Sequence, residues 1–122
     1  MSNATFHLDF THLLQLTGED SEFIIEVLEI IESESPDVLA DMQSQLHSKS
    51  YKKLSATAHK YKSSINILGS QELDNLVKSI ELGAKQSPNH QHLTKLLEDF
   101  EFACQSLMRQ ISQQLAHLRS QV

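Results

Sequence analysis

The sequence contains no tryptophan, three glycines, two prolines and a single cysteine in 122 residues. With so few turn-forming residues, the chain is expected to form a few long helices rather than many short strands. One cysteine excludes an internal disulfide bond and a cysteine-rich metal site. Because Cys104 lies among apolar residues of one helical segment, we interpret it as a buried and unreactive thiol.

Long apolar runs are missing as well. The chain has no signal-peptide pattern and no run of 18 apolar residues, so we expect a soluble, cytoplasmic protein that is not bound to a membrane. Its length suits one domain that buries roughly two-thirds of its unfolded surface. We place a flexible N-terminus at residues 1–7 and a helical-bundle domain at residues 8–120.

Acidic residues are absent from one segment. The net charge of −6 counts against nucleic-acid binding. Between Met42 and Gln71, however, there is no Asp or Glu, and half of the ten basic residues fall there: Lys49, Lys52, Lys53, Lys60 and Lys62. The charge is therefore +5 in this window and −11 in the remainder. This pattern is typical either of a solvated helix face or of a surface that attracts an acidic partner.

Apolar residues recur at helical spacing in one short and four long segments. The short segment is Leu8–Leu16, and the long ones run from Asp20 or Ser21 to Leu46, from Ser50 to Gly69, from Ser70 to Ala84 and from Ser87-Pro88 to Leu118. Pro36 is expected to kink or briefly interrupt its helix, and Pro88 to occupy the first position of the last helix. The sequence therefore predicts an all-α protein, an antiparallel four-helix bundle with a short additional N-terminal helix.

One histidine lies beside the apolar stripe of the third segment. The stripe consists of Tyr51, Leu54, Ala58, Tyr61, Ile65 and Leu68, and His59 stands one residue off it. The residues four before and four after are Ser55 and Ser63, which are small enough to leave the imidazole open to an approaching protein. Lys62 lies one turn further along the helix. An exposed imidazole beside a positive charge is suited to accepting a phosphoryl group, and the Lys62 ammonium can reach an oxygen of such a group.

Lys60 and Asn66 are weaker candidates for the same surface. Lys60 points about 100° around the helix from His59, and Asn66 suits either the rim of a partner surface or ordinary helix-face polarity. The hydroxyls of Ser55 and Ser63 can also bond back to the helix. Because the chain has seven histidines, a solvated His59 without function is the alternative. The other six show no ligand spacing, so we expect no metal site.

The run Ala58-His59-Lys60-Tyr61-Lys62-Ser63-Ser64, with Gly69 ten residues after the histidine, resembles the signature of histidine-containing phosphotransfer (HPt) domains. The resemblance extends from about Leu8 to the end of the last helix. It includes Leu8-Asp9-Phe10, Leu16-Thr17-Gly18-Glu19-Asp20, Phe23, Pro36 and the Ile80-Glu81 pair. Two positions depart: the family most often has glycine where Ser63 stands and an aliphatic residue where Tyr61 stands.

The resemblance implies a helical bundle in which His59 takes a phosphoryl group from one receiver-domain aspartate and gives it to another. The partners would be response regulators or hybrid sensor histidine kinases of two-component systems, and they would supply Mg²⁺ and the acidic catalytic residues. The sequence has no glycine-rich ATP-binding loop, so we expect no kinase activity and no cofactor of its own. The competing hypothesis is a non-catalytic helical adaptor that binds an acidic partner through its lysines.

Overall fold

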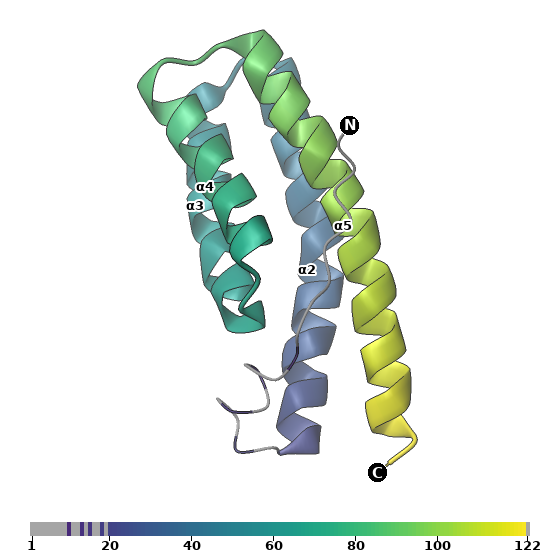
Figure 1. The fold of residues 1–122 in the computed structure, drawn as a ribbon. Coiled ribbons are helices and arrows are strands. Elements are labelled where there is room, and N and C mark those ends of the chain that lie inside the picture. Colours follow the sequence, from purple (N-terminus) through teal and green to yellow (C-terminus); the bar gives the residue numbers. More distant parts are fainter. Residues whose placement is uncertain (1–9, 11–12, 14, 16–17, 19, 122) are drawn as a thin grey trace.

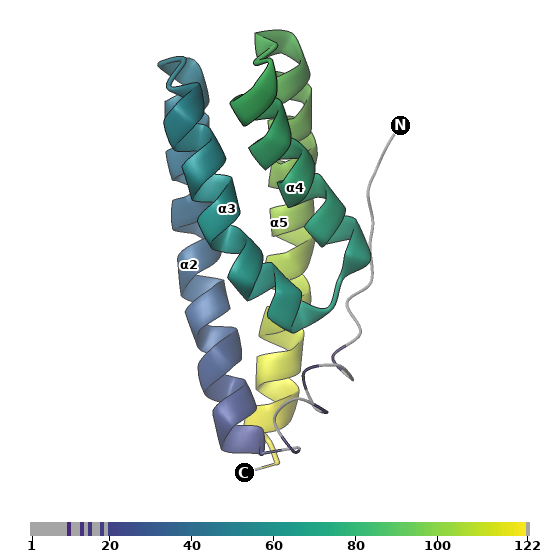
Figure 2. The same cartoon turned by 90° about the vertical axis from the view of Figure 1, so that its left-hand side faces the viewer.

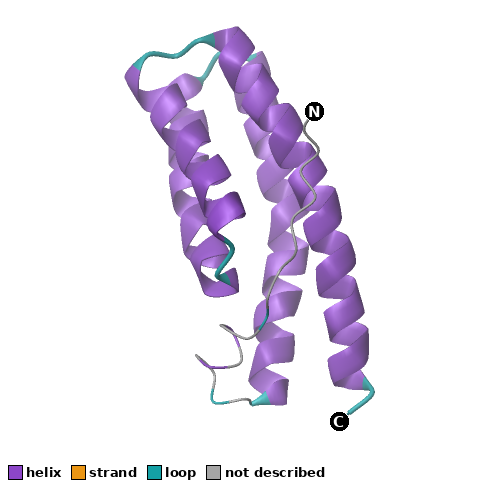
Figure 3. Ribbon diagram, in the orientation of Figure 1, coloured by secondary structure: helices purple, strands orange, loops and turns teal. Residues whose placement is uncertain are grey.

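The computed structural model describes residues 10, 13, 15, 18 and 20–121. This part of the chain contains four helices and no strand (Figure 3): α2 (Ser21–His47), α3 (Tyr51–Leu68), α4 (Gln71–Gln86) and α5 (His90–Arg119). The flexible N-terminus predicted at residues 1–7 lies outside the described residues. So does most of the short helix predicted at Leu8–Leu16, and both stay predictions.

The four helices run in alternating directions and form an antiparallel bundle, as predicted (Figure 1). Helix α3 packs against α2 and α4, and α5 packs against the same two helices from the other side. With 27 and 30 residues, α2 and α5 are much longer than α3 and α4, with 18 and 16. The α3–α4 hairpin therefore covers only part of the longer pair (Figures 1 and 2).

Most helix ends lie where the capping residues predicted them. The Asp20 carboxylate accepts a hydrogen bond from the Phe23 amide at 3.2 Å, and the Ser70 hydroxyl accepts one from the Leu73 amide at 3.3 Å. Each side chain satisfies one amide that the first helical turn leaves without a partner. Gly69 ends α3 with φ of 71°, in the left-handed region that favours glycine.

The predicted start of the last helix is wrong by two residues. Helix α5 begins at His90, and its cap is Asn89, whose side chain accepts a hydrogen bond from the His92 amide at 3.0 Å. Asparagine is among the strongest N-cap residues. Ser87, the cap expected from the Ser-Pro pair, instead closes α4, and Pro88 lies in the connection between the two helices.

Pro36 does not interrupt its helix, since α2 continues through it without a break. The neighbouring Ser35 is fully buried, and its hydroxyl donates to the Ile31 carbonyl at 2.7 Å. That hydroxyl also accepts a hydrogen bond from the Tyr61 hydroxyl of α3. The Tyr61 ring packs edge-on against Phe100 of α5, with ring centres 5.8 Å apart. The tyrosine at this core position is therefore both packed and hydrogen-bonded.

The apolar stripe predicted for α3 forms the buried face of that helix, except that Tyr51 is only partly buried. Five of its residues are buried: Leu54, Ala58, Tyr61, Ile65 and Leu68. The predicted burial of Cys104 is confirmed. Burial raises the pKa of this thiol to about 12, so it stays protonated and unreactive at neutral pH.

Candidate functional site

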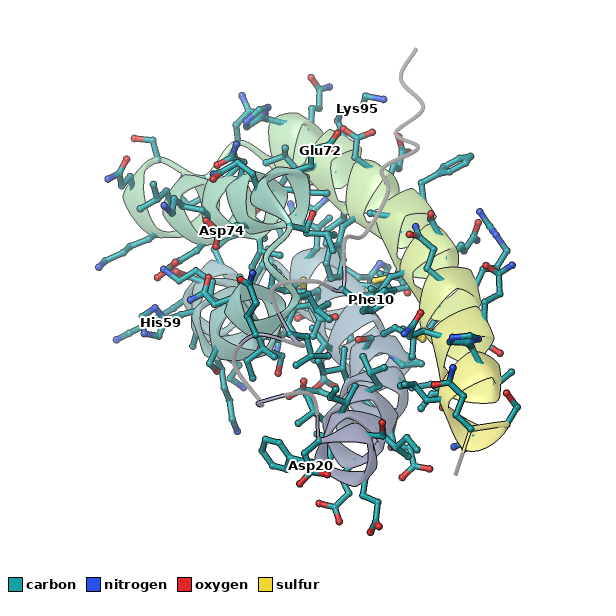
Figure 4. All side chains as sticks on the ribbon, turned by 60° about the horizontal axis from the view of Figure 1, so that its bottom comes forward. Phe10, Asp20, His59, Glu72, Asp74 and Lys95 are labelled. Atoms are coloured by element: carbon teal, nitrogen blue, oxygen red, sulfur yellow. The ribbon has the colours of Figure 1, made fainter. Side chains whose placement is uncertain are left out.

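His59 projects from the outer face of α3, where 69% of its side chain is exposed (Figure 4). Its Nδ1 atom lies 2.7 Å from Oε2 of Glu81, a residue of the neighbouring helix α4. A carboxylate can only accept a hydrogen bond, so Nδ1 carries the proton and donates it. In the neutral ring, Nε2 then has no proton and keeps its lone pair. The exposed ring therefore presents an unprotonated nitrogen, which is the form that a nucleophile requires.

Glu81 also forms an ion pair with Lys62, another residue that the sequence predicted for this site. The Lys62 ammonium lies 2.9 Å from Oε1 of Glu81, so the two carboxylate oxygens hold the imidazole and the ammonium separately. The carboxylate is largely shielded, with 12% of its side chain exposed. The hydrogen bond from Lys62, and with it the one from His59, holds the pKa of Glu81 below its ordinary value, although partial burial acts in the opposite direction. Glu81 is therefore ionised at neutral pH.

Ser55 does not have the position that the sequence predicted. We expected an exposed small residue that leaves the imidazole accessible, but Ser55 is buried between α3 and α4. Its hydroxyl donates to the main-chain carbonyl of Glu81 at 2.9 Å. Because the helices approach closely here, a small side chain is needed for packing rather than for access. This contact also fixes the position of Glu81 along the axis of α4 relative to His59.

The remaining predicted residues lie on the outer surface of α3. Ser63 is exposed, and its hydroxyl bonds back to the Lys60 carbonyl at 3.0 Å, which is the bond to its own helix that the sequence allowed. Its role in leaving the imidazole accessible stays a prediction. Lys60 is exposed as well. Asn66 is exposed near the α3–α4 connection, where it lines a small hollow with Gly69 and Asp74.

A groove of about 660 Å³ between α3 and α4 opens beside His59. Its walls include Tyr51, Lys52, Ala56 and His59 from α3 and Glu81 and Lys85 from α4. The groove extends from the imidazole toward the start of α3, and Tyr51 at that end bonds Nδ1 of His90 through its hydroxyl at 3.0 Å. The histidine therefore stands at the edge of a concave surface and not on a smooth helix.

Sequence reasoning did not assign a role to Glu81, although the Ile80-Glu81 pair belongs to the resemblance. Within the window from Met42 to Gln71 the charged residues are all lysines, so the local sequence around His59 gives no sign of a carboxylate. In the structure, α4 brings a carboxylate from 22 residues away to the imidazole. The sequence signal that points to Glu81 is the apolar residue Ile80 before it. Ile80 is buried in the structure, and the residue that follows it therefore lies at the edge of the buried face of α4.

A protein-family model described as Hpt domain matches residues 26–121, which is most of the chain. The match includes α3, α4 and α5 and most of α2. No curated protein and no solved structure matches the chain. In the described part of the chain, none of the helices is both long enough and apolar enough to cross a lipid bilayer.

Proposed function

Because the chain belongs to the Hpt domain family, whose members are phosphotransfer intermediates in phosphorelays, we propose that His59 is its phosphoacceptor. The phosphoryl group comes from an aspartyl phosphate of one receiver domain and passes to the aspartate of another. The observation that carries this proposal is the hydrogen bond from Nδ1 to Glu81, which leaves Nε2 unprotonated on an exposed ring.

The transfer requires one bond to form and one to break. The Nε2 lone pair of His59 attacks phosphorus, the N–P bond forms, and the P–O bond to the donor aspartate breaks. The electron pair of that bond leaves with the aspartate, which becomes a carboxylate. The ring keeps its Nδ1 proton and acquires positive charge during the attack. Return of the phosphoryl group to a second aspartate is the reverse of these changes.

Glu81 supports both directions of this transfer. Its carboxylate already accepts a hydrogen bond from the Nδ1–H group, so the positive charge that develops on the ring forms beside a fixed negative charge. The same contact keeps the phosphorylated ring protonated at Nδ1, and a cationic ring is the better leaving group. Lys62 lies one turn from His59, and its ammonium balances the charge of Glu81. We propose that the same ammonium also contacts an oxygen of the phosphoryl group.

The partner completes the site. Receiver domains of response regulators or hybrid sensor histidine kinases would bring Mg²⁺ and the acidic catalytic residues. The protein itself would act as a cytoplasmic relay intermediate without kinase activity, since its exposed imidazole offers a nucleophile but the sequence has no ATP-binding motif.

The experiment incubates the protein with a panel of phosphorylated receiver domains and follows acid-labile phosphate. His59→Gln should abolish labelling, and its helical signal and melting transition should match those of the wild type because the ring is exposed. His92→Gln is the matched control, since His92 is also an exposed helical histidine. Persistent labelling of the His59→Gln protein would refute His59 as the phosphoacceptor, whereas binding to receivers without any labelling of the wild type would favour the adaptor hypothesis.

A further inference from the structure

Two stretches of the sequence without acidic residues meet at one end of the bundle. The first is the window from Met42 to Gln71, and the second runs from Leu82 to Leu97. They contain the last turns of α2 and α4 and the first turns of α3 and α5, which lie together at the top of Figures 1 and 2. Positive charge therefore dominates at this end, although the net charge of the chain is −6.

The groove between α3 and α4 opens toward this basic end. Lys52 lies on its α3 wall and Lys85 on its α4 wall, and both side chains are exposed. In the described part of the chain, neither lysine forms an ion pair. Glu81, the acidic residue that lines the groove, is already bound to His59 and Lys62. The groove therefore presents two ammonium groups that are available to bind an anion.

The surface between the two lysines is small and apolar. Ala56 and the buried Ala84 line it, and Tyr51 and Pro88 lie at the end away from His59. The Tyr51 hydroxyl is hydrogen-bonded to His90, which holds the aromatic ring at that end. The groove volume of about 660 Å³ is within the range of sites that bind small molecules. A flat apolar group therefore fits between the two ammonium groups.

We propose that this groove binds a small aromatic phosphate of the nucleoside diphosphate class, and that the bound anion covers one side of His59. The phosphate groups pair with Lys52 and Lys85, and the aromatic ring lies over Ala56 beside Tyr51. The groove only binds this ligand, since the sequence has no glycine-rich ATP-binding loop. Binding is independent of the phosphoacceptor role of His59, whereas its consequence, slower phosphotransfer, rests on the proposed function.

Titration of the isotope-labelled protein with ADP, adenosine and inorganic pyrophosphate, without Mg²⁺, tests the site in the absence of phosphotransfer. ADP should shift the backbone amide signals of Ala56 and Lys85, which line the groove. It should bind at least about tenfold more tightly than adenosine, which has no charge, and than pyrophosphate, which has no aromatic ring. If ADP and pyrophosphate bound equally well, the lysines would attract any anion and the proposal would be overturned. The absence of shifts in the groove would overturn it as well.

Substitutions in the groove have a matched control in Lys53, the exposed lysine next to Lys52 that does not line the groove. Lys52→Ala and Lys85→Ala should each weaken ADP binding at least about fivefold, and Lys53→Ala, with the same change of net charge, less than about twofold. Ala56→Leu places a larger side chain in the groove at an exposed helical position, so it should abolish ADP binding and leave the melting curve unchanged. Equal weakening by Lys52→Ala and Lys53→Ala, or undiminished binding to the Ala56→Leu protein, would contradict the proposed site.

The effect on His59 is measured as the ratio of the transfer rates with and without saturating ADP, in excess Mg²⁺ and from one phosphorylated receiver. ADP should slow transfer to the wild type at least about fivefold and leave the rate of the Ala56→Leu protein unchanged. Equal slowing of both proteins would refute the covering of His59 by the bound anion. If the wild type bound ADP in the groove but accepted phosphate from no receiver, the binding site would stand and the proposed function would fail.

Discussion

Glu81 offers the most direct test of how the site works. Glu81→Ala removes the carboxylate that accepts a hydrogen bond from Nδ1 of His59 at 2.7 Å. It also removes the ion-pair partner of Lys62. A hydrogen bond to a charged group contributes about 1.5–3 kcal/mol, and a fully exposed ion pair about 0–1 kcal/mol. Because the Glu81 carboxylate is shielded from solvent but the His59 ring is exposed, we expect the free energy of this contact to lie between these two ranges. A loss of about 1.4 kcal/mol corresponds to about a tenfold decrease in the transfer rate.

The assay compares Glu81→Ala with Glu81→Gln and with Glu72→Ala. Glu81→Gln keeps an oxygen that can accept the Nδ1 proton but lacks the charge, so it should lose less than the alanine variant. Glu72 is an exposed glutamate on the same helix, far from His59 in Figure 4, and its replacement makes the same change of net charge. The transfer rate from one phosphorylated receiver is measured for each protein under identical conditions.

Nitrogen NMR of the imidazole provides a readout that packing alone would not change. In the wild type, Nδ1 should carry the proton of the neutral ring, and in Glu81→Ala the proton should shift toward Nε2. If the alanine variant kept both the wild-type rate and the Nδ1 proton, then Glu81 would not orient the ring, and the mechanism proposed for His59 would be refuted.

The remaining predictions concern access, packing and pH. Ser63→Gln should slow transfer by obstructing the imidazole, while the free energy of unfolding changes by less than about 0.5 kcal/mol, as for other exposed positions; an unchanged rate would place the docking surface elsewhere. Ser55→Gln should instead destabilise the fold by about 1–3 kcal/mol because its site is buried, which a denaturant titration would show. Tyr61→Phe should cost about 1 kcal/mol, or a decrease of about 3–5 °C in Tm, through loss of the hydrogen bond to Ser35. Because the pKa of Glu81 is below its ordinary value in the folded state, its contribution to stability is complete above about pH 4.5 and is lost as the pH falls through the folded-state pKa. Glu81→Gln should therefore lose less stability than the wild type as the pH falls below about 4.5, and equal losses would contradict the ion pairing.

The helices could be predicted from the sequence because their signals are local. The stripe from Leu54 to Leu68 and the caps at Asp20 and Ser70 depend on residues within a few positions of one another. Pro36 was harder, since a proline inside a long helix costs one hydrogen bond that the packing of the rest of the helix can offset.

The chemistry of the site could be predicted only in part, because half of it comes from a second helix. The position of His59 and the neighbouring Lys62 follow from the spacing within α3. The contact with Glu81 depends on how α4 is rotated about its axis and how far it is shifted along that axis relative to α3. No local sequence pattern specifies either quantity. For the same reason Ser55 looked like a surface residue: one residue off the apolar stripe, it faces α4 across a close approach of the two helices.

The hydroxyl pair between Ser35 and Tyr61 has a consequence for the uniqueness of the folded state. Apolar side chains tolerate many arrangements, so a stripe of leucines alone would allow α3 to slide or rotate against α2 at modest cost. Any such arrangement would bury the Tyr61 hydroxyl without its partner, at about 1–3 kcal/mol, whereas the Ser35 hydroxyl would keep its hydrogen bond to the Ile31 carbonyl. Residues 59 and 61 lie about 200° apart around the helix, so the arrangement that pairs Tyr61 in the core also turns His59 to the solvent. Competing arrangements that would hide the imidazole are thereby kept at low population by a contact on the opposite side of the same helix.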